Sequence, residues 1–154
     1  MSRDENKSTI SKLKKDVILC LKLTIVFGIF FVIVNQQFTL RGIGFIFLLS
    51  AMYSFGLGLG NGFINEYLSS KWSWVDQTSQ RLTAGIIATL VYTIFIVLLI
   101  HYVQYILILG YSFEDFFSGD LFWVHLFTVI FALAIATFFH ARGFMINWKA
   151  SVNQ

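Results

Sequence analysis

The sequence has no proline and a single cysteine, Cys20, among its 154 residues. One cysteine excludes an internal disulfide and a cysteine-rich metal site. Charged residues are also scarce, at 12% of the chain, where a typical soluble domain has roughly 25%. Hydrophobic residues make up 57%, and 18 residues are phenylalanine. A soluble domain of this length cannot bury so much apolar surface, so an ordinary soluble enzyme, a disordered protein and a disulfide-stabilised secreted module are all excluded.

Four apolar runs have the length of a membrane-spanning helix, because a bilayer core of about 30 Å requires about 20 helical residues. The runs lack the alternation of apolar and polar residues that is typical of a transmembrane β-barrel. We therefore predict an all-α, polytopic membrane protein with four transmembrane helices in an antiparallel bundle. The predicted spans are about 17–34, 42–65, 82–109 and 121–139.

The distribution of basic residues predicts the orientation. The N-terminal tail (1–16), the connection 66–81 and the segment after residue 139 together carry nine Lys and Arg residues. The two connections on the other side carry only Arg41. By the positive-inside rule both termini are expected in the cytoplasm. The net charge of +3 is then explained by anchoring next to anionic lipid, so the expected partner is the bilayer and not nucleic acid.

Small residues form a stripe on the second predicted helix. Ser50, Ser54, Gly58 and Gly62 recur every four residues and therefore share one face. Such a stripe lets another helix approach closely. Packing within the bundle, a dimer contact and a flexible functional section all fit this pattern, and we take the four residues as candidates for helix packing or dimerisation.

Two polar clusters flank the membrane. Asn61, Asn65 and Glu66 lie at the inner end of the second helix, where interhelical hydrogen bonding is favoured over an ion or proton site. The connection 110–120 on the outer side carries Glu114, Asp115 and Asp120. These carboxylates form either a solvated acidic loop or an outer sensing loop for a cation or cationic peptide.

The sequence offers little for catalysis. It has no nucleophile with a base at a workable spacing, no phosphate-binding glycine motif and no isolated acid within a helix. We expect no catalytic residue, no cofactor and no metal site. His101 and His125 both lie in the outer halves of their helices, where either a haem-bridging pair or a pH sensor is conceivable; a hydrogen bond to a neighbour is favoured.

Three stretches carry a resemblance to a known family: 49–61 together with Asn65, Trp74 together with 81–85, and 140–149 directly after the last span. They resemble the N-terminal membrane region of LytS/YehU-like bacterial sensor histidine kinases, the Bacteroidetes type that pairs with LytTR response regulators. The resemblance implies a homodimer in the bacterial inner membrane. It also implies that residues 140–154 begin a cytoplasmic signalling helix leading to a kinase domain that these residues do not contain. The signal would leave through His140, Arg142, Gly143, Trp148 and Lys149.

The functional prediction is therefore a membrane-embedded sensor and anchor of a two-component kinase. A small transporter or channel, and a membrane scaffold subunit, remain the alternatives.

Overall fold

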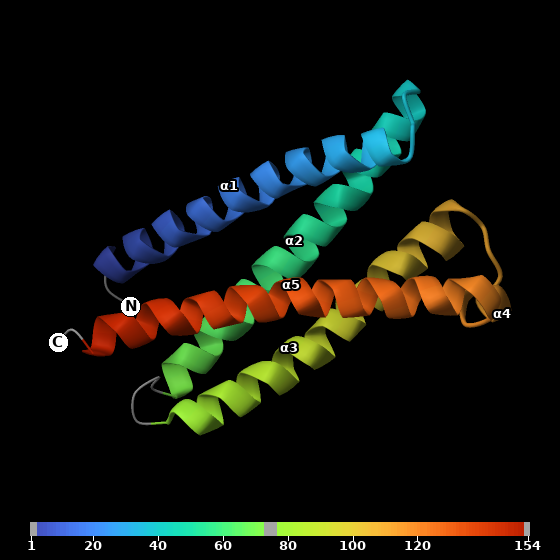
Figure 1. Ribbon diagram of the computed structural model, residues 1–154. Coiled ribbons are helices and arrows are strands. Elements are labelled where there is room, and N and C mark those ends of the chain that lie inside the picture. The colour runs from blue at the N-terminus through green and yellow to red at the C-terminus, as the bar shows by residue number, and fades with distance from the viewer. Residues whose placement is uncertain (1–2, 73–76, 153–154) are drawn as a thin grey trace. The chain divides into compact units, whose positions relative to one another are not determined.

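The computed structural model describes residues 3–72 and 77–152 (Figure 1). Over these residues it contains five α-helices and one π-helix, and no strand. The all-α fold class is thus confirmed. The elements are α1 (Arg3–Val34), α2 (Leu40–Lys71), α3 (Thr78–His101), the π-helix η1 (Tyr102–Ile108), α4 (Phe113–Phe116) and α5 (Gly119–Val152).

Within the described residues, four helical segments are long and apolar enough to cross a membrane: Leu13–Val34, Leu40–Lys71, Thr78–Ile108 and Gly119–Phe138. Two helices extend beyond these segments. The polar tail predicted for residues 1–16 is helical from Arg3 onward, because acidic residues at a helix start and lysines after it favour a helix. At the other end α5 continues past Phe138 to Val152.

The chain divides into two compact units, residues 1–60 and 61–154. In the first, α1 and the beginning of α2 pack in opposite directions. A Cβ on Gly28 would lie 2.8 Å from the ring of Phe47, and a Cβ on Gly58 would lie 2.9 Å from the Sγ atom of Cys20. Cys20 is buried, and its carbonyl accepts a hydrogen bond from Thr24 at 2.8 Å. Glycine at both positions permits this close approach.

The small-residue stripe divides along its length. Ser50 and Ser54 are buried, and Gly58 lies against Cys20 in the first unit. Gly62 belongs to the second unit and has no atom within 4 Å of its Cβ position beyond its own helix. Three of the four stripe residues therefore lie in the packed interior or at the contact with α1, and Gly62 faces open space.

In the second unit α3 and α5 run in opposite directions (Figure 1). Thr89 of α3 is hydrogen-bonded to His140 of α5. His101, which comes later in α3, is hydrogen-bonded to His125, which comes earlier in α5. Small residues on α5, the buried Ala132 and Ala136, lie between those two bonds in sequence. The end of α2 also belongs to this unit. A Cβ on Gly85 would lie 3.9 Å from the side chain of Leu68.

The connection after α3 differs from the prediction. The third span was expected to be one helix to residue 109, but its last part, Tyr102–Ile108, is a π-helix. The expected loop 110–120 contains the short helix α4. Ser112 caps α4 by accepting a hydrogen bond from the backbone N–H of Asp115 at 3.1 Å. Gly110 and Gly119, with φ of 74° and 58°, make the turns on either side, which other residues adopt only with strain.

Replacing Gly58 by Leu should lower the free energy of unfolding by about 1–3 kcal/mol, because the new side chain would collide with Cys20. Gly44→Leu is the matched control on the same helix, since no atom lies within 4 Å of its Cβ position. Unfolding of the purified protein in detergent measures both. Equal stabilities of the two variants would contradict this packing of α1 on α2.

Candidate functional site

The buried face of α3 carries unusually many polar side chains. Its buried residues recur every three or four positions and so form one stripe: Arg81, Gly85, Thr89, Thr93, Val97, Ile100 and His101. Polar groups in a spanning segment are costly unless they find partners inside the protein. In this stripe most of the partners come from α5 and from the end of α2.

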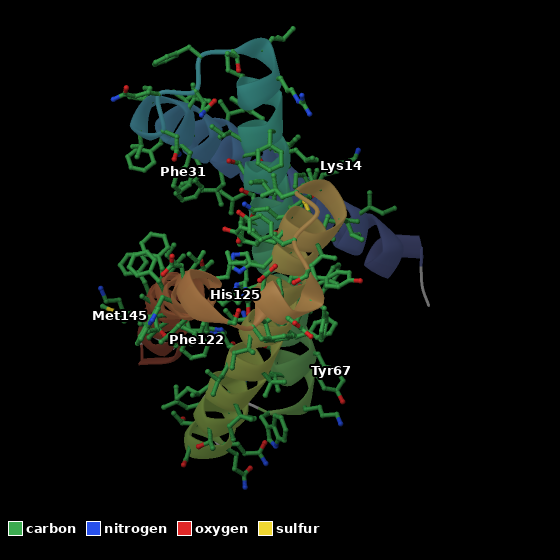
Figure 2. All side chains as sticks on the ribbon, turned by 90° about the vertical axis from the view of Figure 1, so that its right-hand side faces the viewer. Lys14, Phe31, Tyr67, Phe122, His125 and Met145 are labelled. Carbon is green, nitrogen blue, oxygen red and sulfur yellow. The ribbon has the colours of Figure 1, made fainter. Side chains whose placement is uncertain are left out.

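His101, the last residue of α3, and His125 of α5 form the centre of the candidate site. Figure 2 labels His125. Their Nδ1 atoms are 2.5 Å apart. Only 2% of His101 and 5% of His125 is exposed. The Nε2 atom of His125 is 2.7 Å from the carbonyl oxygen of Phe116, the last residue of α4. A continuous line of hydrogen bonds therefore joins α3, α5 and α4.

The Phe116 carbonyl determines the proton positions in the neutral pair. A carbonyl oxygen only accepts, so the Nε2–H of His125 donates to it. A neutral His125 then has an unprotonated Nδ1. The bond between the two rings consequently has His101 Nδ1–H as its donor and His125 Nδ1 as its acceptor.

Aromatic rings enclose this pair. The ring of Phe116, which is 2% exposed, lies 4.5 Å from that of His125. The ring of Tyr105 in η1 stands edge-on to both histidines, at 5.6 Å from His101 and 6.1 Å from His125. The haem-bridging hypothesis does not fit this geometry, because both ring nitrogens of His125 already make hydrogen bonds. The alternative, hydrogen bonding to a neighbour, is what the two histidines do.

The other histidine, His140, lies at the opposite end of the α3–α5 contact. Its Nε2 is 2.8 Å from the hydroxyl of Thr89. Partial burial, and secondly the positive charge of Arg81, lower the pKa of His140 below its ordinary value of 6.5. The neutral form is therefore favoured in the folded protein.

Arg81 joins α3 to the end of α2. Its Nη2 donates to the carbonyl oxygen of Asn65 at 2.7 Å, to Asn65 Oδ1 at 2.6 Å and to Ser69 Oγ at 2.7 Å. The sequence-based expectation of Arg81 as a headgroup anchor in the inner loop is not met, since only 1% of the residue is exposed. The reason is that α3 begins at Thr78, so Arg81 lies one turn inside the helix and faces α2.

The predicted polar cluster separates into different environments. Asn65 bonds Arg81, as expected for interhelical hydrogen bonding. The Oδ1 atom of Asn61 is buried without a hydrogen-bond partner among the described residues. Glu66 is exposed.

The remaining predicted residues lie at the two ends. Glu114, Asp115 and Asp120 are exposed, and the carboxylate of Asp115 accepts a hydrogen bond from Ser112 at 2.6 Å. Lys149 is exposed on α5. The side-chain environments of Arg142, Gly143 and Trp148 lie outside the described part of the chain. Over that part, no three His, Cys, Asp or Glu side chains are grouped to hold a metal ion.

Three participants were not predicted from the sequence: Thr89, the backbone carbonyl of Phe116, and Arg81 in a buried role. The signal for the side chains is that Arg81, Thr89, Thr93 and His101 are separated by multiples of four residues. The capping pattern from Ser112 to Asp115 would have indicated α4.

Comparisons of the chain with protein-family models, with curated proteins and with solved structures find no match. The structure shows a membrane protein with four candidate spanning helices. Its function is inferred below from the geometry of the buried polar residues.

Replacing His101 by Leu should destabilise the protein by about 1–3 kcal/mol, because Nδ1 of His125 is then buried without a donor. The double variant His101→Leu/His125→Leu should cost less than the sum of the two single variants, with a coupling of about 0.5–3 kcal/mol. Phe127→Leu, at a position 71% exposed on α5, is the control and should be nearly neutral. Strict additivity in detergent unfolding would contradict the contact.

Acidification should destabilise the protein through His140. Its pKa is lower in the folded than in the unfolded state, so the unfolded chain binds more protons between the two values. Stability is thus highest above pH 6.5 and falls as the pH decreases toward the folded pKa. His140→Gln, which retains a polar side chain opposite Thr89, should show a smaller loss of stability between pH 7.5 and pH 5. Identical pH dependence of the two proteins would contradict the lowered pKa.

Proposed function

We propose that this membrane protein is the sensor and anchor region of a two-component sensor histidine kinase. It transmits a stimulus through α5 to a cytoplasmic kinase domain that lies beyond these residues. The proposal keeps both termini in the cytoplasm and the helices in the bacterial inner membrane. The homodimer and the LytTR-type response regulator belong to the same proposal.

The observation that carries this proposal is the continuity of α5. The helix begins beside α4, contains His125 six residues later, crosses the membrane-spanning segment and continues past Phe138 to Val152. At 1.5 Å per residue, the part beyond Phe138 extends for about 20 Å. Backbone hydrogen bonds continue across the membrane boundary, so a rotation or shift at the His125 end displaces the far end as well.

The connection at the α4 end is suited to act as an input. It is short, since η1 ends at Ile108 and α5 starts at Gly119. It is also bonded directly to the transmitting helix, through the Phe116 carbonyl and His125. A change in this connection therefore reaches α5 without passing through any other element.

The kinase proposal predicts that the native polypeptide is larger than 17.7 kDa. An antibody against residues 1–16 should detect a band well above that mass in membranes of the source organism. Those membranes should also transfer phosphate from ATP to a histidine of the same band. A single band at 17.7 kDa would overturn the proposal.

Homodimerisation through the extended part of α5 predicts a periodic cross-linking pattern. Single cysteines placed along 140–150 in a Cys20→Ser background should form disulfides between copies most readily at every third or fourth position. Cysteine at Phe127, which is exposed on the same helix, reports contact at membrane depth. Absence of cross-links along the whole extension would contradict a dimer formed by this segment.

A second candidate function, translocation of protons or ions, is favoured by the polar face of α3. Thr93 is fully buried and its hydroxyl has no hydrogen-bond partner among the described residues. Flux through the protein in liposomes tests this function, with Asn61→Leu as the control variant. A flux that the variant abolishes would favour a transporter over a sensor. The sensor proposal predicts no flux above that of empty liposomes.

A further inference from the structure

We propose that α1 carries a binding site for the headgroup of an anionic phospholipid, formed by Lys22 together with Lys15. The lipid belongs to the leaflet that contains the N-terminal end of α1. The site requires only that α1 spans the membrane, so it does not rest on the proposed kinase function.

Lys22 is a charged residue well inside a spanning segment. It is the tenth residue of the 22-residue segment Leu13–Val34, so at 1.5 Å per residue its Cα lies about 13 Å from the start of that segment. Its side chain is exposed, and no described residue forms a hydrogen bond or an ion pair with it. An ammonium group in hydrocarbon is costly unless it reaches the interface or meets an opposite charge. Lys22 therefore needs a partner that the described residues do not supply.

The face of α1 that carries Lys22 points away from its contact with α2. Lys22 is two residues from the buried Cys20 and from the buried Thr24, about 200° around the helix. Cys20 lies against Gly58 of α2. Asp16, the acidic residue of this segment, precedes Cys20 by four residues and therefore shares the face of Cys20.

The neighbours of Lys22 on its own face are apolar and at least 50% exposed: Ile18, Leu19, Ile25, Val26 and Ile29. This surface is suited to acyl chains, with one positive charge in its middle. Packing against apolar side chains and pairing with an anion are thus available to the same ligand.

Lys15 adds a second positive charge to this face. It is exposed and precedes Lys22 by seven residues, which is two helical turns and about 10 Å along the axis. Side chains of a helix tilt toward its N-terminus, so the stem of Lys22 runs toward Lys15 and away from the centre of the membrane. The Lys22 ammonium then meets lipid phosphate at the hydrocarbon edge of the headgroup layer, while Lys15 lies among the headgroups.

An anionic phospholipid fits both parts of this surface. Its phosphate supplies the opposite charge, and its acyl chains pack on the apolar neighbours of Lys22. In a zwitterionic lipid the amine of the headgroup neutralises the phosphate, so this lipid is bound less tightly. A second copy of the chain fits less well, because the acidic residues of the candidate spans lie near the ends of their segments: Asp16, Glu66 and Asp120.

Native mass spectrometry of the detergent-purified protein tests the site. The protein is mixed with phosphatidylglycerol and with phosphatidylcholine of the same acyl chains, and the amount of each lipid that stays bound is measured. The unaltered protein should retain more phosphatidylglycerol. Lys22→Leu should lower the affinity for phosphatidylglycerol about fivefold, since a lysine near anionic lipid contributes about 1 kcal/mol, and should leave that for phosphatidylcholine unchanged. Lys22→Arg should retain the preference.

Lys149→Gln is the matched control, because it removes the same charge from an exposed position on α5. It should keep the affinity of the unaltered protein. Equal binding of the two lipids by the unaltered protein would overturn the proposal, and so would an equal loss in Lys22→Leu and Lys149→Gln, which would show that net charge alone attracts the lipid.

A membrane-permeant carbodiimide tests the other occupant, a carboxylate of a neighbouring protein chain. This reagent joins a lysine to a carboxylate that is in contact with it. In membranes of the source organism, an adduct of the unaltered protein that Lys22→Leu lacks would assign Lys22 to a protein partner and overturn the lipid site. We expect no such adduct. Both results are independent of the kinase assay, since a native protein without a kinase domain would reject the proposed function and leave the lipid site in place.

Discussion

The hydrocarbon of a bilayer offers no hydrogen bonds, and this constraint explains most of the polar contacts between helices in the second unit. A helix that carries Arg81, Thr89, Thr93 and His101 on one face is not stable against hydrocarbon. It is stable against two protein surfaces that supply acceptors and donors at the right heights. The end of α2 supplies Asn65 and Ser69, and α5 supplies His125 and His140. These bonds fix the register of α3 against its neighbours, which apolar packing alone would leave loosely specified.

The sequence was sufficient to predict the four spans, but not η1, α4 or the contacts between the side chains of different helices. The four spans follow from the length and apolarity of the runs, and these do not depend on context. The contact of His101 with His125 depends on register, because a shift of one residue on α5 would turn the second ring away by about 100°. Arg81 is visible in the sequence as a basic residue next to a span, but its burial follows from where α3 begins, and that start is defined by the backbone hydrogen bond from the N–H of Arg81 to the carbonyl of Gln77.

The two ends of the α3–α5 contact have different chemistry. At the α4 end, the imidazoles of His101 and His125 form a hydrogen bond with each other. His125 also forms one with the backbone carbonyl of Phe116 in α4. At the opposite end, His140 bonds a threonine hydroxyl and lies near the positive charge of Arg81. Between these ends the buried side chains are mostly small or apolar, such as Ala132, Ala136 and Val97, and Thr93 is the polar exception among the described residues. The two polar contacts at the ends therefore define how far along each other α3 and α5 pack, which the side chains between them would specify less well.

The π-helix η1 allows the third span to change its helical register locally. A π turn contains one residue more than the α turn it replaces, and the surplus residue can move along the helix without breaking it. If the surplus moves past His101 into α3, each residue that it passes advances by about 1.5 Å and turns by about 100°. Residues before and after that segment keep their places. The span thus has a way to rotate a few buried side chains at one depth of the membrane while its two ends remain anchored.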